Sequence, residues 1–480
     1  MTESKNCTTN FYPELCGVNV VVDPQARLGT DDDRVIIIGQ STGTVTSGAA
    51  QVNDATRAGL YGADSMLNRM ISEFRQSCPT AELWAYALPN TGTAGDADVT
   101  FAGVAAAATS GIVYLWVNGV RYAETFDPTV DTDAILASRF AAAITLNQSE
   151  LTAVAAASVL SITTIGKGEI GGFLDVRSSY SVRPDLTSSP AVTVTIVNTA
   201  PTGLASLAGV AALGQGFEFV VNPYTDDAAI ADVSTYLCGQ WTGGSNSRAY
   251  GVFYGTPTQA ITFGQGANNA LLSYMAIDGA LTPPYLESSS FGCLAYGRLN
   301  CQSNEVSQSM TGMVMPALLA PEFGDRYTAA QQAALIEAGV GYFTVNRVND
   351  VAVGRSVTTY TTADNGTIDL SLADTNKPAQ IACISRFMRE NLTAKYTGYS
   401  FRSDGVVGTN NSKVATIGAI ENYVISLAQR LSDRNLIQDV DGFIESLSVS
   451  VNPDNGCIQV IVDPQLVNQF CCMTVTLRTF

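Results

Sequence analysis

The amino-acid sequence predicts a multidomain α/β protein with a β-rich domain inserted into its first domain and a C-terminal α+β region. Three observations predict this class. A strand, a helix and a second strand follow one another in residues 35–88, as in a βαβ unit. Between residues 89 and 201 the composition changes to Ala, Val, Thr and Ser. The strand–helix alternation then resumes at residue 217.

The first domain begins with a buried strand. Residues 35–38 are a β-branched run that ends at a glycine, which is typical of a strand covered on both faces. We expect Asp64 to cap a helix whose apolar residues recur at helical spacing up to residue 74, and residues 82–88 to form the next strand. Residues 41–48 are rich in Gly, Ser and Thr but lack the lysine of a phosphate-binding loop, so no phosphate site is predicted there.

The insertion is predicted to be a β-rich, peripheral domain with one helix. Asn118-Gly119 is the preferred two-residue turn of a β-hairpin, and residues 134–145 form an alanine-rich helix. Further short strands are predicted at residues 151–154, 160–164, 173–176 and 192–197.

The α/β pattern returns after the insertion. A helix begins at Asp226-Asp227, and because acidic residues in a first turn complement the helix dipole, this pair has a structural explanation and is not predicted to be catalytic. Gly339 ends a later helix, and a long amphipathic helix follows Asp374-Thr375. Other elements are predicted at residues 217–221, 249–254, 271–277, 285–296 and 417–431.

The C-terminal end contains a hairpin and a final strand. Apolar and polar residues alternate in both hairpin strands, on either side of a turn-rich loop at residues 452–456. Pro464 ends the second strand because proline has no N–H to donate. Residues 473–480 form a last alternating strand, which pairs either within its own sheet or with a neighbouring molecule. The apolar hairpin residues are Leu447, Val449, Val451, Ile458, Val460 and Val462.

Charge and composition exclude several classes of function. The net charge is −18, so nucleic acid, which binds Lys and Arg, is not an expected partner. Residues 1–297 carry 12 basic and 26 acidic side chains and residues 298–480 carry 13 and 17, so we expect the C-terminal third to contact neighbours. Apolar runs are too short for a membrane helix, and the N-terminus lacks a signal-peptide pattern, which predicts assembly in a cytoplasm.

Histidine is absent, which removes Ser-His-Asp and Cys-His catalysis and histidine metal ligands. The ten cysteines are spread along the chain without a C-x-x-C pair. We therefore expect reduced thiols and neither a disulfide framework nor a zinc site. No catalytic residue, metal or cofactor is predicted.

Several segments, taken in order along some 450 residues, resemble the tail sheath proteins of contractile bacteriophages, and most closely the Mu-type family. The resemblance is diffuse within the insertion, and no single motif carries it. The matching segments are residues 34–40, 222–226, the strand pair after Gly339, 355–360, 366–369, 386–396 and 463–470.

The resemblance implies a structural protein of the virion and not an enzyme. Such subunits stack as hexameric rings into a sheath around the tail tube and contract to drive the tube through the host envelope. The implied partners are other copies of the chain, the tube protein, and baseplate and tail terminator proteins, without membrane insertion. The implied domains are an N-terminal arm (1–33), a core α/β domain (34–94 and 204–370), the inserted domain (95–203), a C-terminal α+β domain (371–462) and a C-terminal arm (463–480).

The family's subunits are linked by terminal arms that add strands to a neighbour's sheet. Here the resemblance assigns the acceptor role to the 446–462 hairpin, with the six apolar residues named above. The arm residues that it assigns to the interface are Val18, Val20, Val22, Met473, Val475, Leu477 and Phe480.

Two alternatives remain open at this point. One is a virion protein that hydrolyses glycans with a carboxylate pair, which only the abundance of Asp and Glu favours. The other is a glycan-binding module that uses Trp116 and Tyr122, although both aromatics are also explained by packing within a hairpin. Electron microscopy of the purified protein separates these readings, because only a sheath protein forms tubes.

Overall fold

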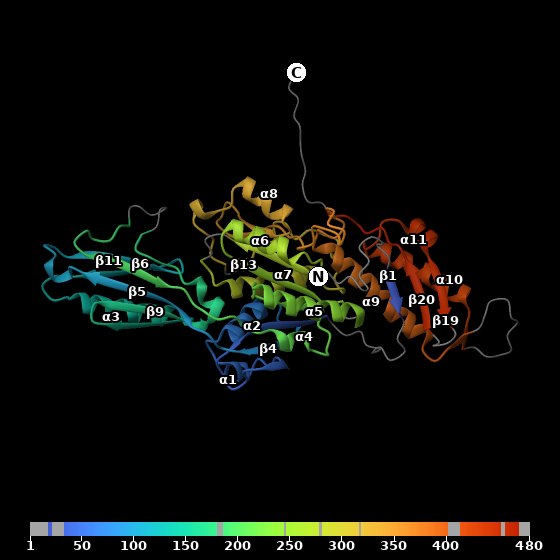
Figure 1. The fold of residues 1–480 in the computed structure, drawn as a ribbon, viewed down its shortest axis with the longest axis horizontal. Coiled ribbons are helices and arrows are strands. Elements are labelled where there is room, and N and C mark those ends of the chain that lie inside the picture. The colour runs from blue at the N-terminus through green and yellow to red at the C-terminus, as the bar shows by residue number, and fades with distance from the viewer. Residues whose placement is uncertain are drawn as a thin grey trace, which may run out of the picture.

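The computed structural model describes residues 18–21, 33–179, 186–243, 246–277, 281–315, 318–401, 413–452 and 457–469. The molecule is elongated: the insertion lies at one end, the largest sheet in the middle, and the C-terminal helices and hairpin at the other end (Figure 1). Several sheets combine with helices, which confirms the predicted mixed α/β class.

An eight-stranded sheet with the order β16-β15-β14-β13-β12-β2-β4-β3 forms the centre. Its inner strands are parallel, and the edge strands β3 and β16 pair antiparallel to their neighbours. Nearly all of β2 is buried, which explains its run of β-branched residues. The strands are β2 (Arg34–Ser41), β3 (Gly48–Gln51), β4 (Glu82–Pro89), β12 (Phe219–Val221), β13 (Arg248–Tyr254), β14 (Leu272–Ile277), β15 (Gly341–Val345) and β16 (Val351–Arg355).

Helices cover both faces of this sheet. Two sets of connections cross the sheet in opposite directions: one runs from β2 through α2 to β4, and the other runs from β12 through β13 to β14. Because such connections are right-handed, α2 lies on one face of the sheet and α5 and α6 lie on the other. Asp64 does not cap α2; the hydroxyl of Ser65 accepts the N–H of Asn68 instead. The helices are α1 (Arg57–Tyr61), α2 (Met66–Ser77), α4 (Ala208–Ala211), α5 (Asp227–Gly243), α6 (Pro257–Ala267), α7 (Pro284–Leu299), η3 (Phe323–Asp325) and α8 (Ala329–Glu337).

The insertion has a hydrophobic core of its own, built from two antiparallel sheets and α3. Asn118 and Gly119 both have positive φ, as the predicted hairpin turn requires. Ile170 and Phe173 belong instead to the core of the central sheet. The elements are β5 (Ala94–Ala102), η1 (Val104–Ala106), β6 (Gly111–Val117), β7 (Val120–Phe126), α3 (Asp133–Asn147), β8 (Leu151–Ala156), β9 (Val159–Lys167), η2 (Gly168–Phe173), β10 (Val176–Arg177) and β11 (Thr193–Thr199).

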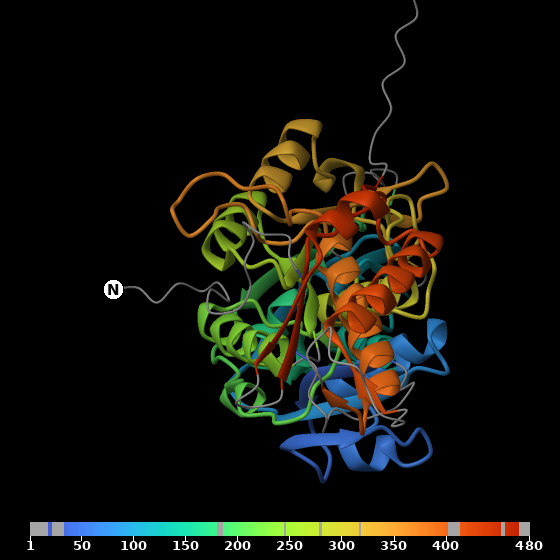
Figure 2. The ribbon, with the colours of Figure 1, turned by 90° about the vertical axis from the view of Figure 1, so that its right-hand side faces the viewer.

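The C-terminal helices share one continuous apolar core with the central sheet. Ile384 and Met388 of α9 and Leu427 of α10 belong to the same buried cluster as Phe343 of β15. The hairpin lies beside these helices (Figure 2). The elements are α9 (Asn376–Tyr396), β17 (Ser400–Phe401), β18 (Val414–Ala415), α10 (Ile417–Asp433), α11 (Val440–Ser446), β19 (Ser448–Asn452) and β20 (Cys457–Val462).

The expectation of reduced thiols is wrong for five of the described cysteines, namely Cys238 and the four members of two pairs. Cys78 is bonded to Cys293, which links the end of α2 to α7. Cys301, just after α7, is bonded to Cys383 of α9. The sequence separations are 215 and 82 residues, so the pairs leave no local motif and only the fold brings them together.

Glu287 of α7 is a carboxyl group in the apolar interior. It is fully buried, and among the described residues neither of its oxygens has a hydrogen-bond partner. Burial raises the pKa of Glu287 well above its ordinary value, because the charged form cannot be solvated there. The carboxyl group therefore favours the neutral form in the folded chain.

We expect Glu287→Gln to stabilise the protein at neutral pH. Because the folded-state pKa is raised, the stability is fully present below the unfolded-state pKa and falls as the pH rises toward the folded-state pKa, by about 1.4 kcal/mol per pH unit. The amide does not ionise, so the difference in the free energy of unfolding between variant and wild type should grow from pH 5 to pH 7 in urea titrations. Glu337→Gln, at an exposed site on α8, is the control; a parallel pH course for both variants contradicts the assignment.

Candidate assembly interface

The C-terminal hairpin forms a three-stranded antiparallel sheet with β1 (Val18–Val21) of its own chain. β20 is the central strand, with β19 on one side and β1 on the other (Figure 1). The register places Val18 opposite Val462 and Val20 opposite Val460. The predicted N-terminal arm strand therefore pairs, within the single chain, with the hairpin that was expected to accept it.

One face of the hairpin is already used by the chain's own core. Val449 is 9% exposed and Val460 and Val462 are fully buried, whereas Ile461 on the opposite face is 39% exposed. Leu447 is partly buried against the same core. The apolar face thus packs inward, and what the hairpin offers to another molecule is a backbone edge.

The other predicted residues are placed only in part. Val451 and Ile458 pair with each other across the hairpin. Val22, Met473, Val475, Leu477 and Phe480 lie outside the described residues. Within the described part of the chain, the outer edge of β19 pairs with no other strand, so it is available as a backbone template.

A buried carboxylate fixes the point where the N-terminal arm joins the core. Asp33, directly before β2, is 2% exposed. One oxygen forms an ion pair with Arg386 of α9, and the other accepts the backbone N–H of Cys301 at 2.8 Å. We call Asp33, Arg386 and Cys301 the arm clamp. Its residues come from three distant segments of the chain. The clamp could not be predicted from the sequence, whose one relevant signal is an aspartate before an apolar strand.

A second ionic contact supports the same region. The backbone N–H of Arg34 donates to Glu218 at 2.8 Å, and Arg386 also donates to Glu390 at 2.8 Å. Burial raises the pKa of Glu218, and the hydrogen bond from the backbone N–H of Arg34 opposes this increase. These contacts tie β2, β12 and α9 together at the amino ends of the parallel strands.

The position where open α/β sheets bind ligands is occupied by the chain itself. That position is the carboxyl end of neighbouring strands whose connections diverge, here β2 and β12. Gln40 donates to the carbonyl of Lys167 at 3.0 Å, and Thr225 donates to Glu169 at 3.1 Å. The segment around η2 therefore covers this end of the sheet. Asp226 accepts the N–H of Ala229, as a helix-capping residue does.

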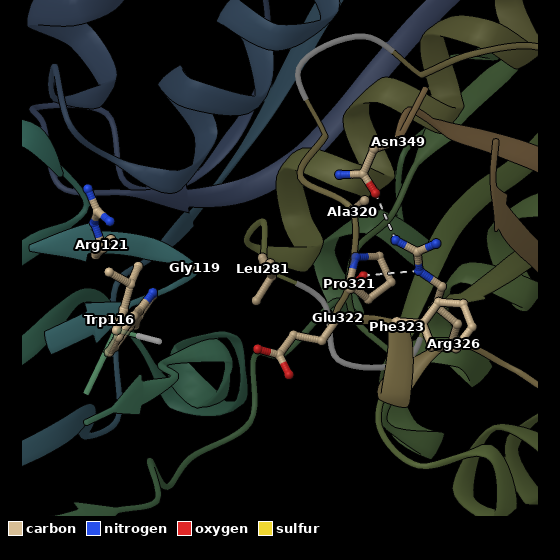
Figure 3. Close-up of a pocket in the computed structure, with 11 residues that line it drawn as sticks. Trp116, Gly119, Arg121, Leu281, Ala320, Pro321, Glu322, Phe323, Arg326 and Asn349 are labelled. Carbon is tan, nitrogen blue, oxygen red and sulfur yellow. Dashed lines mark hydrogen bonds between the residues drawn. The ribbon is translucent and has the colours of Figure 1, made fainter. Parts of the chain in front are cut away.

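A cavity of about 500 Å³ lies between the insertion and the central part of the molecule. Trp116 and Arg121 line one side, and Phe323, Arg326 and Asn349 the other (Figure 3). Arg326 donates to Asn349 at 2.7 Å.

The two aromatics of the glycan-binding alternative are both buried. Trp116 is 5% exposed, and Tyr122, also 5% exposed, accepts a hydrogen bond from Gln148 inside the core of the insertion. Packing in the core of the insertion therefore explains Tyr122, whereas Trp116 lines the cavity. Among the described residues there is no group of three potential acidic, cysteine or histidine metal ligands, and no helix long and apolar enough to cross a bilayer.

Taken together, these features describe an α/β protein with a strand edge left unpaired among its described residues and an N-terminal segment anchored at Asp33. No protein-family model matches the chain. It is 24% identical over 473 residues to the tail sheath protein of the Mu-like prophage FluMu of Haemophilus influenzae, covering 96% of this chain and 94% of that protein. This similarity along nearly the whole length confirms the resemblance to Mu-type tail sheath proteins, which are structural and not enzymes.

Three solved structures are also similar. The sheath tail protein of Desulfitobacterium hafniense has a TM-score of 0.48 at 15% identity, covering 93% of this chain and 95% of that one. The sheath tail protein of Listeria innocua has a TM-score of 0.46 at 12% identity, with coverages of 91% and 92%. A chain of the anti-feeding prophage baseplate has a TM-score of 0.47 at 10% identity, with coverages of 94% and 96%.

We expect Asp33→Asn to destabilise the subunit strongly. The substitution keeps the shape and the acceptor for Cys301 but leaves Arg386, whose side chain is 16% exposed, without its buried counter-ion. Breaking such a pair costs about 3–5 kcal/mol, measured as a lower urea midpoint at unchanged slope. Glu305→Gln is the control, because Glu305 is 54% exposed in its pair with Arg298 and should cost less than about 1 kcal/mol. Equal losses in both variants would contradict the role of the clamp.

Proposed function

We propose that the chain is the sheath subunit of a contractile phage or phage-like tail. The observation that carries this proposal is the similarity to a tail sheath protein over 96% of the chain. In this proposal the subunits form hexameric rings around the tail tube and contract to drive it through the host envelope. Baseplate and terminator proteins end the sheath, which is assembled in the host cytoplasm.

The N-terminal arm is proposed to link subunits by exchanging β1. The pairing of β1 with β20 within one chain supports this, because the same ladder forms when β1 comes from a neighbour. Residues 22–32 connect β1 to the clamp, and an extended segment of that length spans roughly 40 Å. β1 is therefore able to leave its own hairpin while Asp33 stays anchored.

The C-terminal arm is proposed to add a strand to β19 of another subunit. The free outer edge of β19 supports this, and Met473, Val475 and Leu477 alternate as a strand requires. Since the inner face of the hairpin is filled by its own core, the contact is carried by main-chain hydrogen bonds. Such bonds tolerate changes in the angle between subunits, which a contracting sheath needs.

The division into two arms, a core domain, an inserted domain and a C-terminal domain remains part of the proposal. The separate apolar cluster of the insertion supports a unit of its own. Phe173, however, packs on Tyr285 of α7 with ring centroids 5.8 Å apart. An experiment that removes the insertion should therefore retain the segment around η2.

We expect a chain truncated after Gln469 to stay folded and monomeric. The truncation keeps Leu466, which bridges to Ile437, and Val467, which accepts a bond from Gln380. It removes a strand of the proposed interface. The contact then loses a net ~1 kcal/mol of binding free energy per hydrogen bond and ~1.5–3 kcal/mol per buried apolar side chain. Repeated in every subunit, that loss should abolish sedimentable polymer and tubes in electron micrographs, with an unchanged unfolding midpoint.

The matched control is a chain of full length in which Gly and Ser replace residues 470–480. It should behave like the truncation, because pairing and not length is lost. Thr474→Ser, on the polar side of the strand, should polymerise normally. A truncated chain that unfolds would show that the last strand belongs to its own sheet, and tubes formed by the truncated chain would refute the linking role of this arm.

A further inference from the structure

The Cys301–Cys383 disulfide joins the two segments that hold the Asp33 carboxylate. Cys301 lies just beyond α7 and donates its backbone N–H to Asp33 at 2.8 Å. Cys383 lies in α9 three residues before Arg386, so the two side chains project from neighbouring turns on one side of the helix. The chain from Asp33 through Arg386, α9, the disulfide and Cys301 back to Asp33 is thus a closed ring of contacts.

We propose that this disulfide is a redox staple for the arm clamp: its formation fixes the distance between the two donors and so strengthens the hold on Asp33. Without the bond, α9 and the segment after α7 are joined there by packing and by the carboxylate. With it, both donors are positioned before Asp33 binds, so less conformational entropy is lost on binding.

The chemistry is a thiol–disulfide exchange with a small oxidised disulfide. Cys301 is half-buried whereas Cys383 is 3% exposed, so the thiolate of Cys301 is the accessible group. It attacks one sulfur of the small disulfide and forms a mixed disulfide, releasing one small thiol. Cys383 then displaces the second small thiol, and the two protein thiols are oxidised by two electrons while the small disulfide is reduced to two thiols. The two thiol protons leave on those products.

The second disulfide provides an internal comparison. Cys78–Cys293 also involves α7, but it links that helix to α2, and neither of its cysteines donates to Asp33. A general effect of cross-linking the core is therefore common to these two bonds, and of the two it is Cys301–Cys383 that joins the segments of the clamp.

The consequence for assembly rests on the proposed function. A cytoplasm holds small thiols in reduced form, whereas a released virion meets oxidants. In that setting the staple closes after the subunits have been made, and it fixes the root of the arm once the arm has found its place.

The test is a double-mutant cycle on the full chain, oxidised with glutathione disulfide. The equilibrium constant for unfolding is measured for wild type, Asp33→Asn, Cys383→Ser and the double variant, with Cys293→Ser in place of Cys383→Ser as the matched control. We expect Asp33→Asn and Cys383→Ser to be non-additive by about tenfold, within the range for residues that share one network. The control cycle should be additive.

A second readout does not depend on the stability of the variants. Limited proteolysis of the arm segment, residues 22–32, is compared in oxidised and phosphine-reduced wild type and Asp33→Asn, both carrying Cys238→Ser because Cys238 is itself disulfide-bonded. Reduction should increase cleavage by about tenfold, and in Asp33→Asn, where the clamp is already lost, reduction should change it little. Equal responses of wild type and Asp33→Asn, or additivity in both cycles, would overturn the staple. Failure of any variant to form tubes bears on the proposed function only, because neither readout requires polymer.

Discussion

The structure depends on one continuous apolar core that runs from the central sheet into the C-terminal helices. α7 is at its middle: Phe291 packs on Tyr250 of β13 and faces Phe343 of β15, while the same cluster extends to Ile384 of α9. Because protein interiors are close-packed, elements that share such a core move together. In the proposed sheath, larger movements between subunits would therefore occur in segments that leave this core.

Asp33 lies at the boundary between the continuous core and the N-terminal arm that leaves it. On one side is β2, buried on both faces, and on the other is the arm that ends in β1. A buried carboxylate with two donors from different helical regions holds this boundary in place. The arm is thus anchored at one end by a buried ion pair and attached at the other by a ladder of backbone hydrogen bonds, which are different kinds of contact with different responses to salt and to strain.

Much of the fold could be predicted because its signals are local. The run of residues in β2, the spacing in α2 and the alternation in β20 each follow from the period of one element. β5 was missed since Asp96, Asp98 and Thr100 fill its outer face and the apolar side has only Ala97, Val99 and Phe101. Pairing with β9 and β11 makes these residues a strand.

The candidate interface likewise has a part that local sequence patterns predict and a part that they do not. The hairpin and the position of β1 follow from alternation, but the partners of Asp33 and of the cysteines are set by tertiary contacts across 82 to 353 residues of sequence. No spacing rule reaches that far without homologous sequences. The resemblance assigned the valines of the hairpin to an interface, whereas Val449, Val460 and Val462 are buried in the subunit's own core.

That burial has a physical consequence for how such a hairpin can bind. A face that is already covered cannot gain apolar area from a partner, so only the edges remain, and an edge contributes mainly directional hydrogen bonds. Each bond is weak on its own, yet a strand adds several at once and fixes the register through alternation. A contact of this kind rotates with its strand while the core behind it stays unchanged. In the three-stranded sheet β20 therefore holds β1, and the outer edge of β19, unpaired among the described residues, is the edge that the proposed C-terminal arm would use.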